Sequence, residues 1–197
     1  PDGDLGEWTR QVWSPLGEPC QARFATGPAD RRPSPEACRM RWSVRAGADG
    51  MHLALDVQGE IAKDRFTVFL DPRPAVELGT VGRYYWLSGV LKPDGVLALS
   101  PGETSPRGLK PVGRWAAADG RTRLECTVPY ALFEQQGWPA SGDLGLSLWW
   151  VHQGGDGQTT HLLWSEDGHP WNPRWYGVVR LQETPDPAAL PWMVRVR

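Results

Sequence analysis

Tryptophan is the residue type in this sequence that most clearly suggests a binding chemistry. The chain has 12 Trp, and each indole offers a large flat apolar surface with one hydrogen-bond donor. Such rings stack on the apolar faces of sugars or anchor a protein partner, and both uses need polar side chains nearby. The candidates for ligand or partner binding are Trp86, Trp149, Trp171, Trp175, Asn172, Arg174 and Trp192.

The spacing of these tryptophans decides which of them can face a ligand. Apolar residues alternate from Leu144 to Trp150, so that Trp149 must point away from the face that carries the leucines. We expect a sugar to lie between two rings, Trp86 or Trp149 on one side and Trp171 or Trp175 on the other. The alternative is that these rings close the ends of the domain or face a protein partner.

Three aspartates, two of them near the N-terminus, suggest a calcium site. Calcium binds several oxygen ligands, often carboxylates, and Asp2 and Asp4 could join Asp64 if the N-terminus folds back. The alternative is that these aspartates stabilise turns and caps. No other cofactor is expected, because the sequence has no Cys-x-x-Cys motif and no Cys/His cluster.

The three cysteines differ in their surroundings. Cys20 and Cys38 flank a polar, Pro-rich stretch, and in an oxidising compartment a disulfide between them would close that loop. The alternative is that both are free thiols. Cys126 lies in an apolar, alternating stretch and is predicted to be a buried thiol.

Catalytic patterns are missing from the sequence. Glu166 and Asp167 are adjacent and would not face each other across a substrate. Ser165 has no nucleophile-elbow pattern around it, and the Gly-rich stretch 154–157 lacks the Lys-Ser/Thr pair of a phosphate loop. We therefore expect a non-catalytic protein.

Short alternating stretches separated by turn signals must position all of these residues. The chain has 23 Gly and 19 Pro, which favours many short strands over long helices. Tight turns are expected at Ala48–Gly50, Pro93–Gly95 and Asp119–Gly120, and a short helical turn at Pro129–Phe133. Strands are expected at 38–45, 51–57, 64–71, 83–91, 96–99, 113–118, 121–128, 144–152, 161–165 and 175–181. This pattern predicts an all-β fold, an antiparallel two-sheet sandwich of jelly-roll or immunoglobulin-like type with little helix.

Length and charge limit the organisation and the partners. A chain of 197 residues is expected to form one domain over 1–181, followed by a Pro-rich extension over 182–197 that docks on the domain or on a partner. The net charge of −2 and the mixed signs argue against nucleic-acid binding. No apolar stretch is long enough to cross a membrane as a helix.

Six segments carry a shared pattern in order along the chain: Asp2–Trp8, Asp64–Pro72, Leu124–Phe133, Leu144–Val151, Leu163–Ser165 and Asn172–Gly177. Together they resemble the family 9 carbohydrate-binding modules and the wider DOMON-like group. The resemblance implies a β-sandwich and a sugar-binding or interaction role. That family often has an acidic residue in its central strand, where this sequence has Thr67, so its calcium or sugar-hydroxyl ligand is missing at that position.

Two functions therefore follow from the sequence. The first is an accessory interaction subunit of a larger extracytoplasmic complex, membrane-bound or redox-active, which the missing acidic residue and the apolar end of the extension favour. The alternative is a carbohydrate-binding module that stacks sugars on exposed tryptophans. In both cases we expect a periplasmic or secreted location.

Overall fold

The architecture follows from alternating strands that each expose one face to a shared core. A computed structural model describes residues 2, 4–8, 13–16, 23–26, 40–46, 50–58, 64–71, 85–102, 111–129, 143–153, 159–163, 176–183 and 192–196. Strands make up nearly all of these residues, and a single 3-10 turn, η1 (Gly6–Trp8), precedes them. The predicted all-β sandwich is confirmed.

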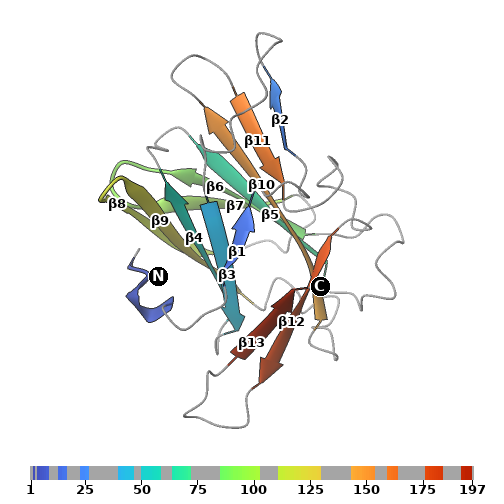
Figure 1. Ribbon diagram of the computed structural model, residues 1–197. Coiled ribbons are helices and arrows are strands. Elements are labelled where there is room, and N and C mark those ends of the chain that lie inside the picture. Colours follow the sequence, from blue (N-terminus) through green and yellow to red (C-terminus); the bar gives the residue numbers. More distant parts are fainter. Residues whose placement is uncertain are drawn as a thin grey trace.

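The first sheet has five antiparallel strands in the order β1-β3-β4-β9-β8 (Figure 1). Two of its hairpins were predicted from turn signals, and the structure forms both pairings. In the β8–β9 turn, Asp119 and Gly120 have φ values of 55° and 69°, the left-handed conformation that Asp-Gly accepts in a two-residue hairpin turn. The strands are β1 (Ser14–Leu16), β3 (Met40–Ala46), β4 (Gly50–Gln58), β8 (Val112–Ala118) and β9 (Arg121–Pro129).

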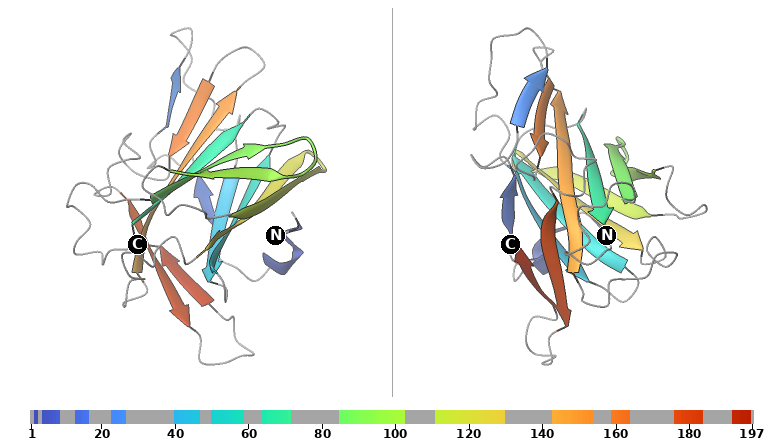
Figure 2. Two further views of the ribbon diagram at one scale, coloured as in Figure 1. Left: turned by 180° about the vertical axis from the view of Figure 1, so that it is seen from behind. Right: turned by 90° about the vertical axis from the view of Figure 1, so that its right-hand side faces the viewer.

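The second sheet has eight strands and is organised around one long strand, β10 (Asp143–Gln153). One edge of β10 pairs with β5 (Arg65–Asp71), followed by β6 (Tyr85–Leu91) and β7 (Leu97–Pro101). Two strands pair with the other edge of β10. β12 (Gly177–Glu183) pairs with the first part of β10, and β11 (Thr159–Leu163) pairs with its last part. β2 (Arg23–Thr26) and β13 (Trp192–Val196) extend these two ends, so β10 joins both halves of the sheet (Figures 1 and 2).

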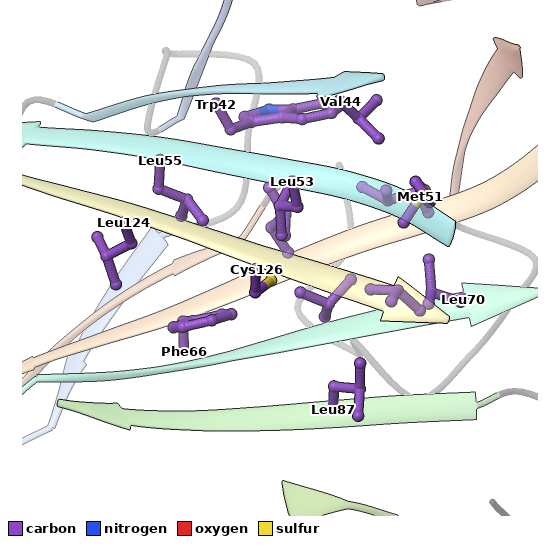
Figure 3. Packing of buried hydrophobic residues seen from close by; sticks show 14 of the residues in the cluster. Trp42, Val44, Met51, Leu53, Leu55, Phe66, Leu70, Leu87, Leu124 and Cys126 are labelled. Carbon is purple, nitrogen blue, oxygen red and sulfur yellow. The ribbon is translucent and has the colours of Figure 1, made fainter. Parts of the chain in front are cut away.

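The hydrophobic core fills the space between the two sheets. Side chains from β4 and β9 meet those from β5 and β6 there (Figure 3). The predicted inward face of 144–150 is confirmed, since Leu144, Leu146, Leu148 and Trp150 are all buried in this cluster. Cys126 is also buried in this cluster, as predicted. Its burial, and to a smaller extent the negative charge of Glu125, raise the pKa of its thiol to about 12.

The N-terminal segment covers part of the outer face of the first sheet. Trp8 is 1% exposed and its indole nitrogen donates to the carboxylate of Glu125 on β9. The backbone N–H of Asp2 donates to the same carboxylate at 3.1 Å. Arg45 on β3 lies 4.6 Å from the Trp8 ring centre. The segment is therefore held to the sheet by packing, hydrogen bonds and a cation–π contact.

The end of the chain contributes to the second sheet. β12 continues across the boundary expected at residues 181 and 182, and β13 pairs with it from Val179↔Val196 to Glu183↔Trp192. Part of the predicted extension is thus a strand of the domain. Pro129, the first residue of the predicted helical turn at Pro129–Phe133, is the last residue of β9. The other residues of that turn lie outside the described part of the chain. Within the described part of the chain, no helix has the length and apolarity to cross a membrane.

Candidate functional site

The outer face of the second sheet collects the described side chains that could bind a sugar. Trp149 on β10 pairs with Thr67 on β5, which in turn pairs with Ser88 on β6. Paired residues share a face, so these three side chains form one row across three strands. Their neighbours Leu148 and Trp150 point into the core. All three residues of the row are partly exposed, so an indole stands beside two hydroxyl groups.

The Trp149 ring is held in place by His161 on β11. Trp149 Nε1 lies 3.0 Å from His161 Nδ1, and the two rings stack with centres 5.6 Å apart and planes 25° apart. An indole N–H only donates, so Nδ1 must accept, and His161 must be neutral with its proton on Nε2. Burial, and then the positive charge of Arg65, lower the pKa of His161. The neutral ring that the hydrogen bond requires is therefore the form favoured at neutral pH.

The two hydroxyl groups in the row contact each other. Thr67 Oγ1 lies 3.0 Å from Ser88 Oγ. Each hydroxyl keeps further capacity to donate or accept. Thr67 occupies the position where the resembled family often has an acidic residue, so this face offers neutral hydroxyls there in place of a carboxylate.

Trp86 lies in the adjacent row of the same face. Ser147 pairs with Phe69, and Phe69 pairs with Trp86. The Trp86 ring lies flat against Gly102, where a Cβ would come within 2.2 Å of the ring. Trp86 and Trp149 are two strands apart, about 10 Å, and two residues apart along the strands, about 7 Å. The structure thus places two of the predicted tryptophans on one face, but not in contact.

The row that contains Trp86 also contains a buried hydroxyl. Ser147 is fully buried, and its Oγ has no hydrogen-bond partner among the described residues. Phe69 in the same row is also buried, and its ring lies 6.3 Å from that of Tyr176. A buried hydroxyl without a partner costs about 1–3 kcal/mol. Such a group is a natural partner for a buried water.

Asp64 is separated from the other predicted calcium ligands. Its side chain is 1% exposed and accepts from Trp150 Nε1 at 2.8 Å, and His152 Nδ1 lies 2.8 Å from the same oxygen. The backbone N–H of Gln153 donates to its other oxygen. Asp2 and Asp4 stabilise the N-terminal turn near Glu125, in the other sheet. Among the described residues, no group of three or more potential ligands gathers to hold a metal ion. The structure does not bring the three aspartates together.

Several predicted residues lie outside the described part of the chain. They are Trp171, Asn172, Arg174 and Trp175, together with Cys20 and Cys38 of the proposed disulfide. Trp192 begins β13 and pairs with Glu183, but its side chain is not described. The pairing of Trp86 or Trp149 with Trp171 or Trp175, and the disulfide, therefore stay predictions.

Sequence reasoning missed the role of His161. It lies 12 residues beyond Trp149 in the chain and becomes its neighbour only because β11 turns back along β10. The alternation of 161–163 predicts a strand, but nothing local indicates which strand it pairs with. A histidine on the strand that follows the tryptophan strand is the one signal in the sequence that could have suggested this contact.

Comparison with known proteins supports the fold. The sequence matches no family model and no curated protein. Two solved structures of a family 9 carbohydrate-binding module from Caldicellulosiruptor kristjanssonii are similar. The complex with cellotriose has a TM-score of 0.64 at 14% identity and covers 96% of this chain and 92% of that one. The complex with glucose has a TM-score of 0.64 at 12% identity and covers 94% and 92%.

A further solved structure, from a Bacteroides uniformis protein proposed to bind carbohydrate, has a TM-score of 0.55 at 13% identity, covering 90% of this chain and 91% of that one. The similarity extends over almost the whole chain, while the identity is too low to carry a function across. The resemblance read from the sequence is thus confirmed at the level of the fold: this chain has the β-sandwich fold of the family 9 carbohydrate-binding modules.

Proposed function

We propose that this chain is a carbohydrate-binding module that binds a neutral saccharide on the outer face of its second sheet. The observation that carries the proposal is the Trp149 ring, fixed by stacking and a hydrogen bond to His161 and flanked by the hydroxyls of Thr67 and Ser88. A fixed flat ring binds the apolar face of a pyranose without losing side-chain freedom on binding. The hydroxyls are placed to bind the equatorial hydroxyls at its edge.

The surroundings of the ring favour a neutral ligand. Thr67, Ser88 and Ser147 carry no charge, and Arg65 is the charged side chain in the adjoining row on β5. Trp86, about 12 Å from Trp149 by strand geometry, lies beyond the reach of one pyranose ring. We therefore favour an oligosaccharide over a monosaccharide. The structural neighbours with bound cellotriose and glucose make β-linked glucose oligomers the first ligands to test.

The experiment is a titration of the full chain with cellotriose and with glucose, followed by calorimetry. We expect saturable binding of cellotriose, and Trp149→Ala should weaken it at least tenfold, because a central aromatic contact is worth about 2 kcal/mol. Trp13→Ala is the matched control. Trp13 is also a partly exposed tryptophan, but it lies against Arg41 on the first sheet.

Two results would count against the proposal. The first is equal binding by the wild-type chain and Trp149→Ala, which would place the sugar elsewhere. The second is no binding to any member of a panel of soluble and insoluble glycans. That result would turn attention to the interaction-subunit function, tested by identifying proteins that co-purify with the native chain.

The interaction-subunit function stays a prediction. The sequence features that favour it are the missing acidic residue at Thr67 and the apolar end of the chain, and part of that end forms β13 within the domain's own sheet. The proposed module carries no catalytic step. We also propose that it works in the periplasm or outside the cell, which fractionation of the source organism would test. Mass spectrometry of the unreduced chain would test the disulfide between Cys20 and Cys38.

A further inference from the structure

The outer face of the first sheet carries a group of arginines around one buried carboxylate. Arg41 on β3 pairs with Asp56 on β4, and Asp56 pairs with Arg123 on β9. In the next row on the same face, Gln58 pairs with Arg121. Residues paired across strands share a face, so Arg41, Arg121 and Arg123 all lie on the face of the sheet that carries Asp56.

Asp56 fixes two of these arginines. Arg41 places Nε at 2.9 Å and Nη2 at 2.8 Å from Asp56 Oδ2, and Arg121 places Nε at 2.8 Å from Oδ1. The carboxylate is 3% exposed, while the Arg41 and Arg121 side chains are 52% and 34% exposed. Burial raises the pKa of Asp56, but the hydrogen bonds and charges of Arg121 and Arg41 outweigh it, so the pKa is lowered. Asp56 therefore stays ionised and holds both guanidinium groups by their Nε sides.

This arrangement leaves positive charge and donors unused. In the described part of this face, Asp56 binds two arginines, and a third, Arg123, lies on the strand paired with it. Arg123 has no hydrogen-bond or ion-pair partner among the described residues. Only some of the N–H groups of Arg41 and Arg121 bind Asp56, so their remaining donors are free to bind a ligand. Among the described residues of β9, Glu125 also carries an acid on this face, and it is bound by Trp8 and by the backbone of Asp2.

A hollow of about 320 Å³ opens at this place and is lined by Met40, Arg41, Gln58 and Arg121. Its lining combines two guanidinium groups with an uncharged amide, and Arg123 flanks it one row away. Guanidinium groups recognise phosphate and sulfate oxygens through paired hydrogen bonds. Because Asp56 fixes the arginines beforehand, little side-chain freedom is lost when an anion binds.

We propose that this hollow is a binding site for a tetrahedral oxyanion, a phosphate or sulfate group, held by Arg41, Arg121 and Arg123. The site lies on the opposite side of the sandwich from the Trp149 face and does not depend on the glycan proposal. The group could reach the site as a free ion or as an ester on a sugar. Both sources share the chemistry that the arginines recognise.

The test is an NMR titration of the arginine Nε–Hε signals of the full chain at neutral pH and constant ionic strength. One arm uses inorganic phosphate and the other uses glucose 6-phosphate. We expect saturable shifts confined to Arg41, Arg121 and Arg123. Tighter binding of the ester would identify a phosphorylated sugar as the source, and equal binding would identify the oxyanion alone.

Two variants check the site without removing the Asp56 contacts. Arg123→Gln should weaken phosphate binding about tenfold, the effect of one charge-assisted hydrogen bond. Gln58→Glu should weaken it by a similar or larger factor, because the new carboxylate opposite Arg121 competes with the anion. Lys92→Gln is the control, since it removes one positive charge from the exposed β6–β7 turn.

The proposal fails if the arginine signals shift linearly without saturation. It also fails if Arg123→Gln and Gln58→Glu bind phosphate as the wild-type chain does, or if Lys92→Gln weakens binding equally. In the last case the effect would come from the overall charge of the molecule. Loss of cellotriose binding in Trp149→Ala alongside intact phosphate binding would separate the two sites.

Discussion

The two sheets of this protein have outer faces built by the same strand alternation but with different chemistry. On the second sheet, Trp149 stands partly exposed beside neutral hydroxyls and is fixed by a histidine. On the first sheet, Trp8 is buried against Glu125, and arginines surround Asp56. Tryptophan is thus a buried packing residue on one face and a partly exposed residue on the other. What differs is that Trp8 belongs to a segment that packs over its sheet, whereas Trp149 is itself part of a strand.

The largest expected effect tests this difference between the two tryptophans. Trp8→Ala should lower the free energy of unfolding by about 3–5 kcal/mol, because it empties a buried site and removes a donor from Glu125. Trp149→Ala should lower the free energy of unfolding much less, but it should remove most of the glycan binding. Urea unfolding would compare the stability of the two variants, and calorimetry would compare their glycan affinity. If both variants lost the same stability, Trp149 would be a packing residue.

The next effect concerns the support of Trp86. Gly102→Ala should lower the free energy of unfolding by about 1–3 kcal/mol, since the new Cβ would lie within 2.2 Å of the Trp86 ring and force it to move. If Trp86 contacts the saccharide, cellotriose affinity should fall as well. Gly120→Ala is a useful contrast. It has no atom within 4 Å of the added Cβ, and only its φ of 69° opposes the change. Unchanged affinity in a folded Gly102→Ala chain would exclude Trp86 from the site.

The arginine face should be sensitive to acid. The pKa of Asp56 is lowered in the folded chain, so its contribution to stability is complete above the pKa of an unfolded aspartate, about 3.9, and is lost as pH falls through the lower folded value. Asp56→Asn should therefore lower the free energy of unfolding by about 1–2 kcal/mol at neutral pH. The loss is no larger because water partly screens the charges of the arginines. The difference from the wild-type chain should shrink in strongly acidic solution. A difference that did not change with pH would mean that Asp56 contributes through packing alone.

The smallest effect concerns the histidine of the second face. The pKa of His161 is lowered below its usual value of 6.5, so the neutral form that accepts from Trp149 prevails at neutral pH. As pH falls below 6.5, the unfolded chain takes up a proton first, and stability declines until the folded histidine is also protonated. Glycan affinity should fall only at the lower end of this range, where the folded His161 takes up its proton, and by less than about tenfold.

The control for this prediction is His161→Asn, whose side-chain oxygen can accept from Trp149 at any pH. Intrinsic tryptophan fluorescence and cellotriose affinity should then lose their dependence on pH in this range. Persistence of the same pH profile in the variant would assign it to another group.

The sequence alone determined which face of each strand turns inward. The alternation from Leu144 to Trp150 predicts both the buried leucines and the outward Trp149, and the structure confirms this. Cys126 was predicted to be buried for the same reason, and it is. Turn residues such as Asp119 and Gly120 located the hairpins. These features are local, since a strand's alternation and a tight turn depend on residues within a few positions of each other.

Only the tertiary structure decided which outward side chains meet. Asp56 contacts Arg41 across 15 positions and Arg121 across 65, and Trp149 lies beside Thr67 from a strand far away in the chain. Such contacts depend on strand order and register, which are set by packing of the whole core. For that reason the aspartates predicted to share a calcium ion bind different sheets: Asp2 contacts Glu125 on β9, and Asp64 contacts β10. Alternation tells each side chain which way to point, and the assembly of the two sheets determines its neighbours.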